Sequence, residues 1–208
     1  MRQLMRILLF LISWCLLCVS CIPLRNASGM KIPSPKEVRT PTFGGDMTEA
    51  VFHGSMELYE HHFSGIFALK KESEEKYRMV LMSEVGMTLL DFSFTSKDFQ
   101  VNYCIDPLRK KALLNLLYRD FLLLTVSPKS ESLKQGKEQF EQAQFILYKK
   151  EKSRDFYYFE KGTMVQIVSK AFLNRTDIQF VEMKEGMADS IKIKHKPVKL
   201  RMALKRIN

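Results

Sequence analysis

The sequence predicts an α+β fold that is mostly β, a curled antiparallel sheet with one helical insertion. Three observations support this fold class. Apolar and polar residues alternate in short segments from about residue 49 to residue 105, with a few polar residues between segments. A leucine-rich segment with helical spacing follows, and alternation then resumes to the end of the chain. Because short links join the segments, neighbouring strands should be antiparallel.

The first half of the domain is predicted to be a β-meander. The segment "AVFHGSMELYEHHFSGIFALKKE" divides at Glu60–His61 into two strands. The next strand covers residues 77–82. Leu90, Phe92 and Phe94 then alternate with polar residues, which is the period-2 pattern of a half-buried sheet.

The helix is expected to begin at Pro107, with Asp106 as its N-cap, and to stop before Ser127–Pro128. Its apolar positions at helical spacing are Leu113, Leu116, Leu117, Phe121 and Leu124, and Leu114 and Leu122 widen this face. The remaining polar positions, Arg109, Lys110, Lys111, Arg119 and Asp120, leave only a narrow polar strip.

The polar stretch "KSESLKQGKEQFEQA" after the helix is read as a loop or a weak second helix. Further strands follow from "QFILYKKE" to the closing "DSIKIKHKPVKLRMALKRI", which makes roughly ten strands in one sheet. Such a sheet must curl around something to bury its apolar face.

The N-terminal residues are typical of an export signal. Arg2 and Arg6 precede an apolar run that is too short for a membrane-spanning helix. Val19-Ser20-Cys21 is similar to a bacterial lipobox, in which the cysteine is acylated and becomes the new N-terminus. Ordinary cleaved secretion and an uncleaved anchor are the alternatives. The predicted organisation is a signal peptide at 1–20, a lipidated N-terminus and flexible tether at 21–45, and a folded domain at 46–208.

Composition and motifs argue against several classes of function. The formal charge of +10 is spread along the chain, and an exported protein rarely meets nucleic acid. His61 and His62, the only histidine cluster, would point to opposite faces of a strand and could not share a metal. Cys104 in an apolar strand is typical of an inert buried thiol. We therefore expect no enzyme, no metal and no cofactor.

The strand pattern resembles that of LolB-type outer-membrane lipoproteins and other domains of the LolA/LolB fold. In the segment "FSGIFALKKESEEKYRMVLMSEVGMTLLDFSF", Gly65, Leu81, Ser83 and Gly86 occupy the positions of the family's glycine, leucine, serine and glycine. The ending "ADSIKIKHKPVKLRMALKRI" resembles the family's last hairpin. The resemblance implies an incomplete β-barrel over a helical lid, enclosing an apolar cavity that in LolA and LolB carries the acyl chains of lipoproteins.

The resemblance implies a lipid-anchored periplasmic protein that binds acyl chains or lipoproteins. Its ligand-binding residues, on the lid helix and facing the cavity, would be Leu113, Leu117, Phe121 and Leu124. A structural or assembly lipoprotein that binds a protein partner is the alternative, and a filled core remains the alternative to a cavity. Because Ile22 and not Asp follows Cys21, we expect the protein at the periplasmic face of the outer membrane, held there by its lipid anchor. We also expect it to be a monomer.

Overall fold

The computed structural model describes residues 39–43, 47–126, 133–137, 144–149 and 153–207. All of them belong to one compact unit, Ile32–Asn208. The predicted signal peptide, Cys21 and residues 21–38 of the predicted tether lie outside the described residues.

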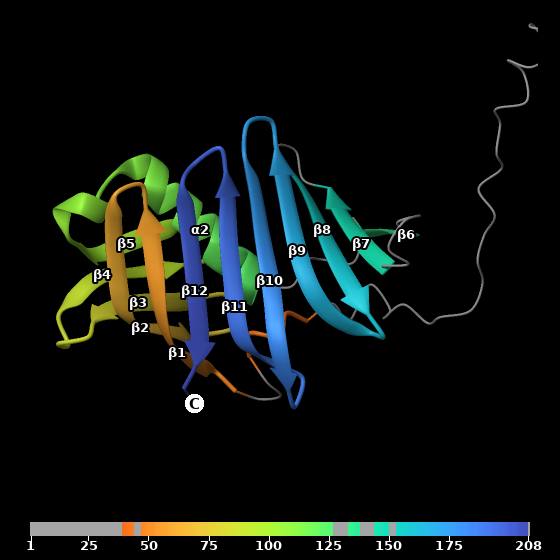
Figure 1. The fold of residues 1–208 in the computed structure, drawn as a ribbon, viewed down its shortest axis with the longest axis horizontal. Coiled ribbons are helices and arrows are strands. Elements are labelled where there is room, and N and C mark those ends of the chain that lie inside the picture. The colour runs from red at the N-terminus through yellow and green to blue at the C-terminus, as the bar shows by residue number, and fades with distance from the viewer. Residues whose placement is uncertain (1–38, 44–46, 127–132, 138–143, 150–152, 208) are drawn as a thin grey trace, which may run out of the picture. The chain divides into compact units, whose positions relative to one another are not determined.

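A single antiparallel sheet of twelve strands forms the described domain (Figure 1). The strands are β1 (Glu49–Leu58), β2 (His61–Lys71), β3 (Tyr77–Ser83), β4 (Thr88–Phe94), β5 (Phe99–Cys104), β6 (Leu133–Lys137), β7 (Gln144–Lys149), β8 (Ser153–Glu160), β9 (Thr163–Ala171), β10 (Arg175–Lys184), β11 (Met187–Lys196) and β12 (Leu200–Arg206). Their spatial order is β5-β4-β3-β2-β1-β12-β11-β10-β9-β8-β7-β6. The edge strands β5 and β6 do not pair with each other in this order, so the sheet is not a closed barrel.

Pairing between β1 and β12 joins two meanders into the one sheet, with Met56 opposite Met202 and Gly54 opposite Leu204. Alternate residues of each strand face the interior, because side chains in a strand alternate between faces. In β12, for example, Leu200, Met202 and Leu204 are buried and the residues between them are exposed. Leu90, Phe92 and Phe94 are buried in β4 as the alternation predicted. Asp91 between them is buried as well, against the Arg78 guanidinium, so the polar face of β4 is not fully exposed.

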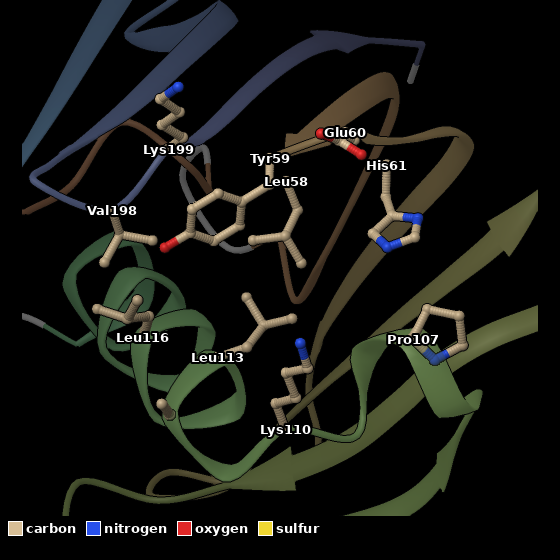
Figure 2. A pocket seen from close by; sticks show the side chains of 11 residues that line it. Leu58, Tyr59, Glu60, His61, Pro107, Lys110, Leu113, Leu116, Val198 and Lys199 are labelled. Atoms are coloured by element: carbon tan, nitrogen blue, oxygen red, sulfur yellow. The ribbon is translucent and has the colours of Figure 1, made fainter.

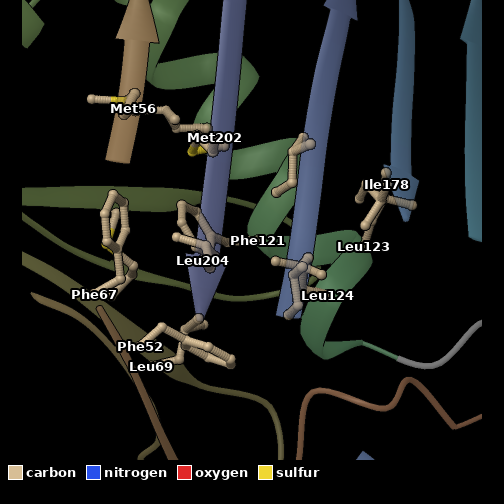
Figure 3. Packing of buried hydrophobic residues seen from close by; sticks show 14 of the residues in the cluster. Phe52, Met56, Phe67, Leu69, Phe121, Leu123, Leu124, Ile178, Met202 and Leu204 are labelled. Atoms are coloured by element: carbon tan, nitrogen blue, oxygen red, sulfur yellow. The ribbon is translucent and has the colours of Figure 1, made fainter. Parts of the chain in front are cut away.

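The helix is two elements, a 3₁₀ turn at Asp106–Leu108 and α2 at Lys111–Thr125. The prediction that one helix begins at Pro107 with Asp106 as its cap is therefore wrong. Pro107 sits in the 3₁₀ turn, and Lys110, with extended backbone angles, precedes α2 without a side-chain cap. Helix α2 lies against the inner face of the sheet (Figure 1), and Phe121 and Leu124 pack among side chains from several strands (Figure 3).

Two other expectations need correction. The polar stretch after the helix contains strand β6, so the sheet has twelve strands where the sequence indicated roughly ten. Asp120 is fully buried and does not belong to a polar strip on α2. Both errors arise because the local pattern does not reveal which distant segment will pair with a polar residue or a short strand.

Residues 39–43, in the predicted tether, pack on the domain. The Thr40 hydroxyl donates a hydrogen bond of 2.7 Å to the carbonyl oxygen of Leu124, at the end of α2. The backbone N–H of Ala188 donates to the carbonyl of Pro41 at 2.8 Å. The Phe43 ring stacks on Tyr77 with centroids 6.3 Å apart. Contacts with the folded domain therefore begin at least as early as Thr40, ahead of residue 46, where the domain was expected to start.

Candidate functional site

A pocket of about 540 Å³ opens where the start of α2 meets two turns of the sheet. The turns are those between β1 and β2 and between β11 and β12, which Figure 1 shows at the same end of the sheet. The lining residues are Leu58, Tyr59, Glu60, His61, Pro107, Lys110, Ala112, Leu113, Leu116, Val198 and Lys199. Small-molecule sites commonly occupy roughly 300–1,000 Å³, so this pocket is large enough for a ligand.

The walls of the pocket are largely apolar. Leu113 and Leu116 come from the first turns of α2, and they are faced by Leu58 at the end of β1 and by Val198 on the β11–β12 turn (Figure 2). Tyr59 lies beside Val198 and closes the sheet side. Its φ of 53° is a left-handed backbone angle that is unfavourable for an aromatic residue. Lys161 and Glu185 have nearly the same angle at the first position of two other two-residue hairpin turns, so the angle of Tyr59 belongs to the turn.

Two lysines lie at the edges of the apolar walls. Lys110, the residue before α2, points its side chain into the space bounded by Leu58 and His61 (Figure 2). Lys199 lies on the β11–β12 turn at the opposite edge of the pocket, and its side chain extends away from Lys110 (Figure 2). Glu60 is the one carboxylate among the lining residues.

The start of α2 adds to this field. The helix has neither a side-chain cap nor an acidic residue in its first turn. Its first backbone N–H groups and the positive end of its dipole are therefore free to attract an anion at the pocket, beside Lys110 and Ala112. The pocket thus combines apolar walls with a positively charged rim.

Of the four helix residues predicted to line a cavity, only Leu113 lines this pocket. Leu117, Phe121 and Leu124 are buried in the core, one to three turns further along α2. Phe121 meets Phe92 of β4 edge-to-face, with ring centroids 6.0 Å apart. These three residues fill the space between helix and sheet, and the open volume lies at the helix start.

A buried polar chain ties α2 to the sheet. His195 of β11 places Nε2 2.8 Å from Oδ2 of Asp120 and Nδ1 3.2 Å from the hydroxyl of Thr176, its cross-strand neighbour on β10. Asp120 is 0% exposed and His195 8% exposed. Burial raises the pKa of the Asp120 carboxyl, and the neighbouring His195 opposes that rise.

Hydroxyl, imidazole and carboxylate occur here in the order used by hydrolases. The Thr176 hydroxyl is buried, however, and none of the three residues lines the pocket. The geometry fits a structural link between α2 and the sheet. The sequence offered no signal for it, because Asp120 and His195 are 75 residues apart.

The sequence analysis also did not identify the pocket residues on the sheet turns as binding residues. Tyr59 and Glu60 were seen only as a strand break, and Val198 only as part of an alternating strand. Cys104 is buried, and burial raises the pKa of its thiol, in keeping with the prediction of an inert cysteine. Among the residues that the structure describes, no three His, Cys, Asp or Glu side chains gather as a metal site.

Solved structures share this architecture. A LolA superfamily protein from Nitrosomonas europaea superposes with a TM-score of 0.50 at 7% sequence identity, over 84% of this chain and 89% of that chain. The chain has a LolA/LolB-like fold. The resemblance predicted from the strand pattern is confirmed at the level of the fold.

Two further structures superpose on this chain with lower scores. One is described as an outer membrane lipoprotein-sorting protein domain from Vibrio parahaemolyticus, with a TM-score of 0.45, 8% identity, and coverage of 77% of this chain and 84% of that chain. The other is a DUF1329 family protein from Desulfovibrio piger, with a TM-score of 0.44, 8% identity, and coverage of 78% and 85%. No protein-family model and no curated sequence matches the chain.

Proposed function

We propose that this protein binds the acyl chain of an anionic lipid or lipoprotein in the pocket at the start of α2, as a carrier or sorting protein and not as an enzyme. The observation that carries the proposal is the combination of apolar walls, from Leu58, Leu113 and Leu116, with Lys110 and Lys199 at the rim. An acyl chain needs the walls, and a carboxylate or phosphate headgroup needs the cations.

The LolA/LolB-like fold supports this proposal, since one structural relative is a LolA superfamily protein and another is described as a lipoprotein-sorting domain. The structure modifies the version expected from sequence. Because Leu117, Phe121 and Leu124 fill the interior, the ligand is accommodated at the start of α2 and not along its whole length.

We further propose that acylated Cys21 anchors the protein to the periplasmic face of the outer membrane. The support is the lipobox-like Val19-Ser20-Cys21 and the absence of Asp after it. More than one acyl chain is needed for lasting anchorage, and a lipobox cysteine carries more than one in the families it resembles. The Cys21→Ala variant should stay unprocessed or poorly anchored, and normal processing with normal detergent partitioning would contradict this assignment.

Binding is tested by titrating the purified chain with cis-parinaric acid, a fluorescent fatty acid, in the absence of vesicles. We expect saturable binding with one site per chain. Leu116→Asp should abolish it, because a carboxylate placed in the apolar wall repels the ligand's own carboxylate and hydrates the pocket. Val85→Asp, on the exposed β3–β4 turn, is the matched control and should bind as the wild type does.

The headgroup is tested with the methyl ester of the same acid. The ester should bind more weakly to the wild type, and Lys110→Gln with Lys199→Gln should remove that difference. Saturable binding that survives Leu116→Asp would refute the pocket assignment. Absence of saturable binding by the wild type would refute the acyl-binding function.

A further inference from the structure

The turn between β9 and β10 carries two adjacent apolar side chains that no described residue covers. Phe172 is 96% exposed and Leu173 is 72% exposed. The turn is closed by a backbone hydrogen bond of 2.8 Å from Ala171 N–H to the carbonyl of Asn174, and Figure 1 shows it projecting from the end of the sheet. Exposed apolar residues that occur singly need no explanation. Here Phe172 and Leu173 together form an apolar tip.

A row of cations lies just behind the apolar tip. Arg175 on β10 pairs directly with Lys170 on β9 and with Lys196 on β11, so three exposed positive side chains stand side by side. Like charges in directly opposite positions destabilise a sheet. Among the described residues this charge has two compensating contacts: Arg175 reaches Asp177 at 3.5 Å, and the Lys170 ammonium lies 4.9 Å from the centre of the Phe156 ring. An external anionic surface would relieve the repulsion. We call Lys170, Arg175 and Lys196 the basic row.

We propose that the β9–β10 hairpin is a membrane-docking element. The apolar tip enters the boundary between headgroups and acyl chains of an anionic bilayer, and the basic row contacts the lipid phosphates. Peripheral membrane segments combine these two features, and each cation near an anionic surface strengthens binding. A stable protein interface needs about 800 Å² from each partner, far more than two side chains at a hairpin tip present, so the chemistry favours a bilayer.

Docking by this hairpin would bring the pocket to the membrane surface. Lys196 ends β11, and the next turn supplies Val198 and Lys199 to the pocket wall. Figure 1 shows the β9–β10, β11–β12 and β1–β2 turns at the same end of the sheet. The hairpin proposal stands whether or not the pocket takes an acyl chain, because the fatty-acid titration contains no bilayer and the following experiment contains no fatty acid.

The test places a fluorescent reporter at the tip of the full chain, which makes it insensitive to how strongly the N-terminus anchors the protein. The substitution Trp14→Phe removes the only tryptophan of the full chain, so that the unprocessed protein also carries no second reporter. In this background Phe172→Trp is compared with Ile207→Trp. Ile207 is 57% exposed and follows β12 at the opposite end of the sheet (Figure 1). Both variants are mixed with vesicles of phosphatidylcholine, with or without phosphatidylglycerol, carrying brominated acyl chains.

We expect emission from the Phe172→Trp variant to shift to shorter wavelength and to be quenched on phosphatidylglycerol vesicles, while the Ile207→Trp variant stays unchanged. Replacing Lys170→Gln and Lys196→Gln together should weaken the vesicle response about fivefold per cation, and added salt should weaken it further. Quenching of Phe172→Trp no greater than that of Ile207→Trp would overturn the docking proposal. Equal quenching on neutral and anionic vesicles would overturn the role of the basic row.

Discussion

Leu117→Ala tests whether α2 is a packed core helix or a lid over a hollow interior. Leu117 is 1% exposed and lies in the main hydrophobic cluster, away from the pocket. Truncating a leucine in a packed core costs about 2–5 kcal/mol, because both transfer free energy and packing contacts are lost. Tight packing of neighbouring Phe121 on Phe92 leaves little room for the site to collapse, so we expect a loss in the free energy of unfolding of about 3 kcal/mol or more.

Leu116→Ala is the matched control. It removes the same atoms at the neighbouring position, but the Leu116 side chain is half-buried and lines the pocket. Truncation there should lower the free energy of unfolding by roughly half of the value for a fully buried leucine, which is about 1 kcal/mol. Urea unfolding followed by circular dichroism measures both variants, with and without cis-parinaric acid. Bound ligand should stabilise Leu117→Ala as much as the wild type, and Leu116→Ala less. A loss for Leu117→Ala as small as that for Leu116→Ala would refute the packed core and restore the lid.

Three further predictions concern stability. Asp120→Ala leaves His195 buried without its carboxylate and should lower the free energy of unfolding in urea by about 3–5 kcal/mol. Replacing both residues by leucine should recover most of that loss. An equal loss in the single and the double variant would contradict a buried pair. The Arg78 guanidinium donates two hydrogen bonds to Asp91 and lowers the pKa of that carboxyl. The stability that this pair contributes is present above the ordinary pKa of aspartate and disappears as the pH falls through the lowered value, so Arg78→Met should cost about 1 kcal/mol or less at neutral pH and nothing in strong acid. Gly65 has a φ of 148° and an added Cβ would collide with a backbone carbonyl of β3, so Gly65→Ala should lower the free energy of unfolding by at least about 1–3 kcal/mol; a wild-type melting curve would contradict this.

The sequence by itself was sufficient for the features that depend on local periodicity. The alternation of Leu90, Phe92 and Phe94 and the strand break near Glu60 needed no knowledge of distant residues, because the backbone of a strand sends successive side chains to opposite faces. The antiparallel arrangement followed from the short links, and the LolA/LolB resemblance followed from the order of these strands. The wide apolar face of the helix indicated that it meets apolar groups, but it left open whether the helix is a lid over a cavity or part of a filled core.

Only the tertiary structure decided what covers each apolar face and where space is left. Asp120 looks like a surface residue of α2 until His195, 75 residues away, is placed beside it. The pocket arises from Leu58, Leu113 and Val198 on three separate elements, and no single segment carries its pattern. Periodicity reports that a face is apolar, but packing depends on how a curved sheet and a helix fit together, and that fit is set by contacts between residues far apart in the chain.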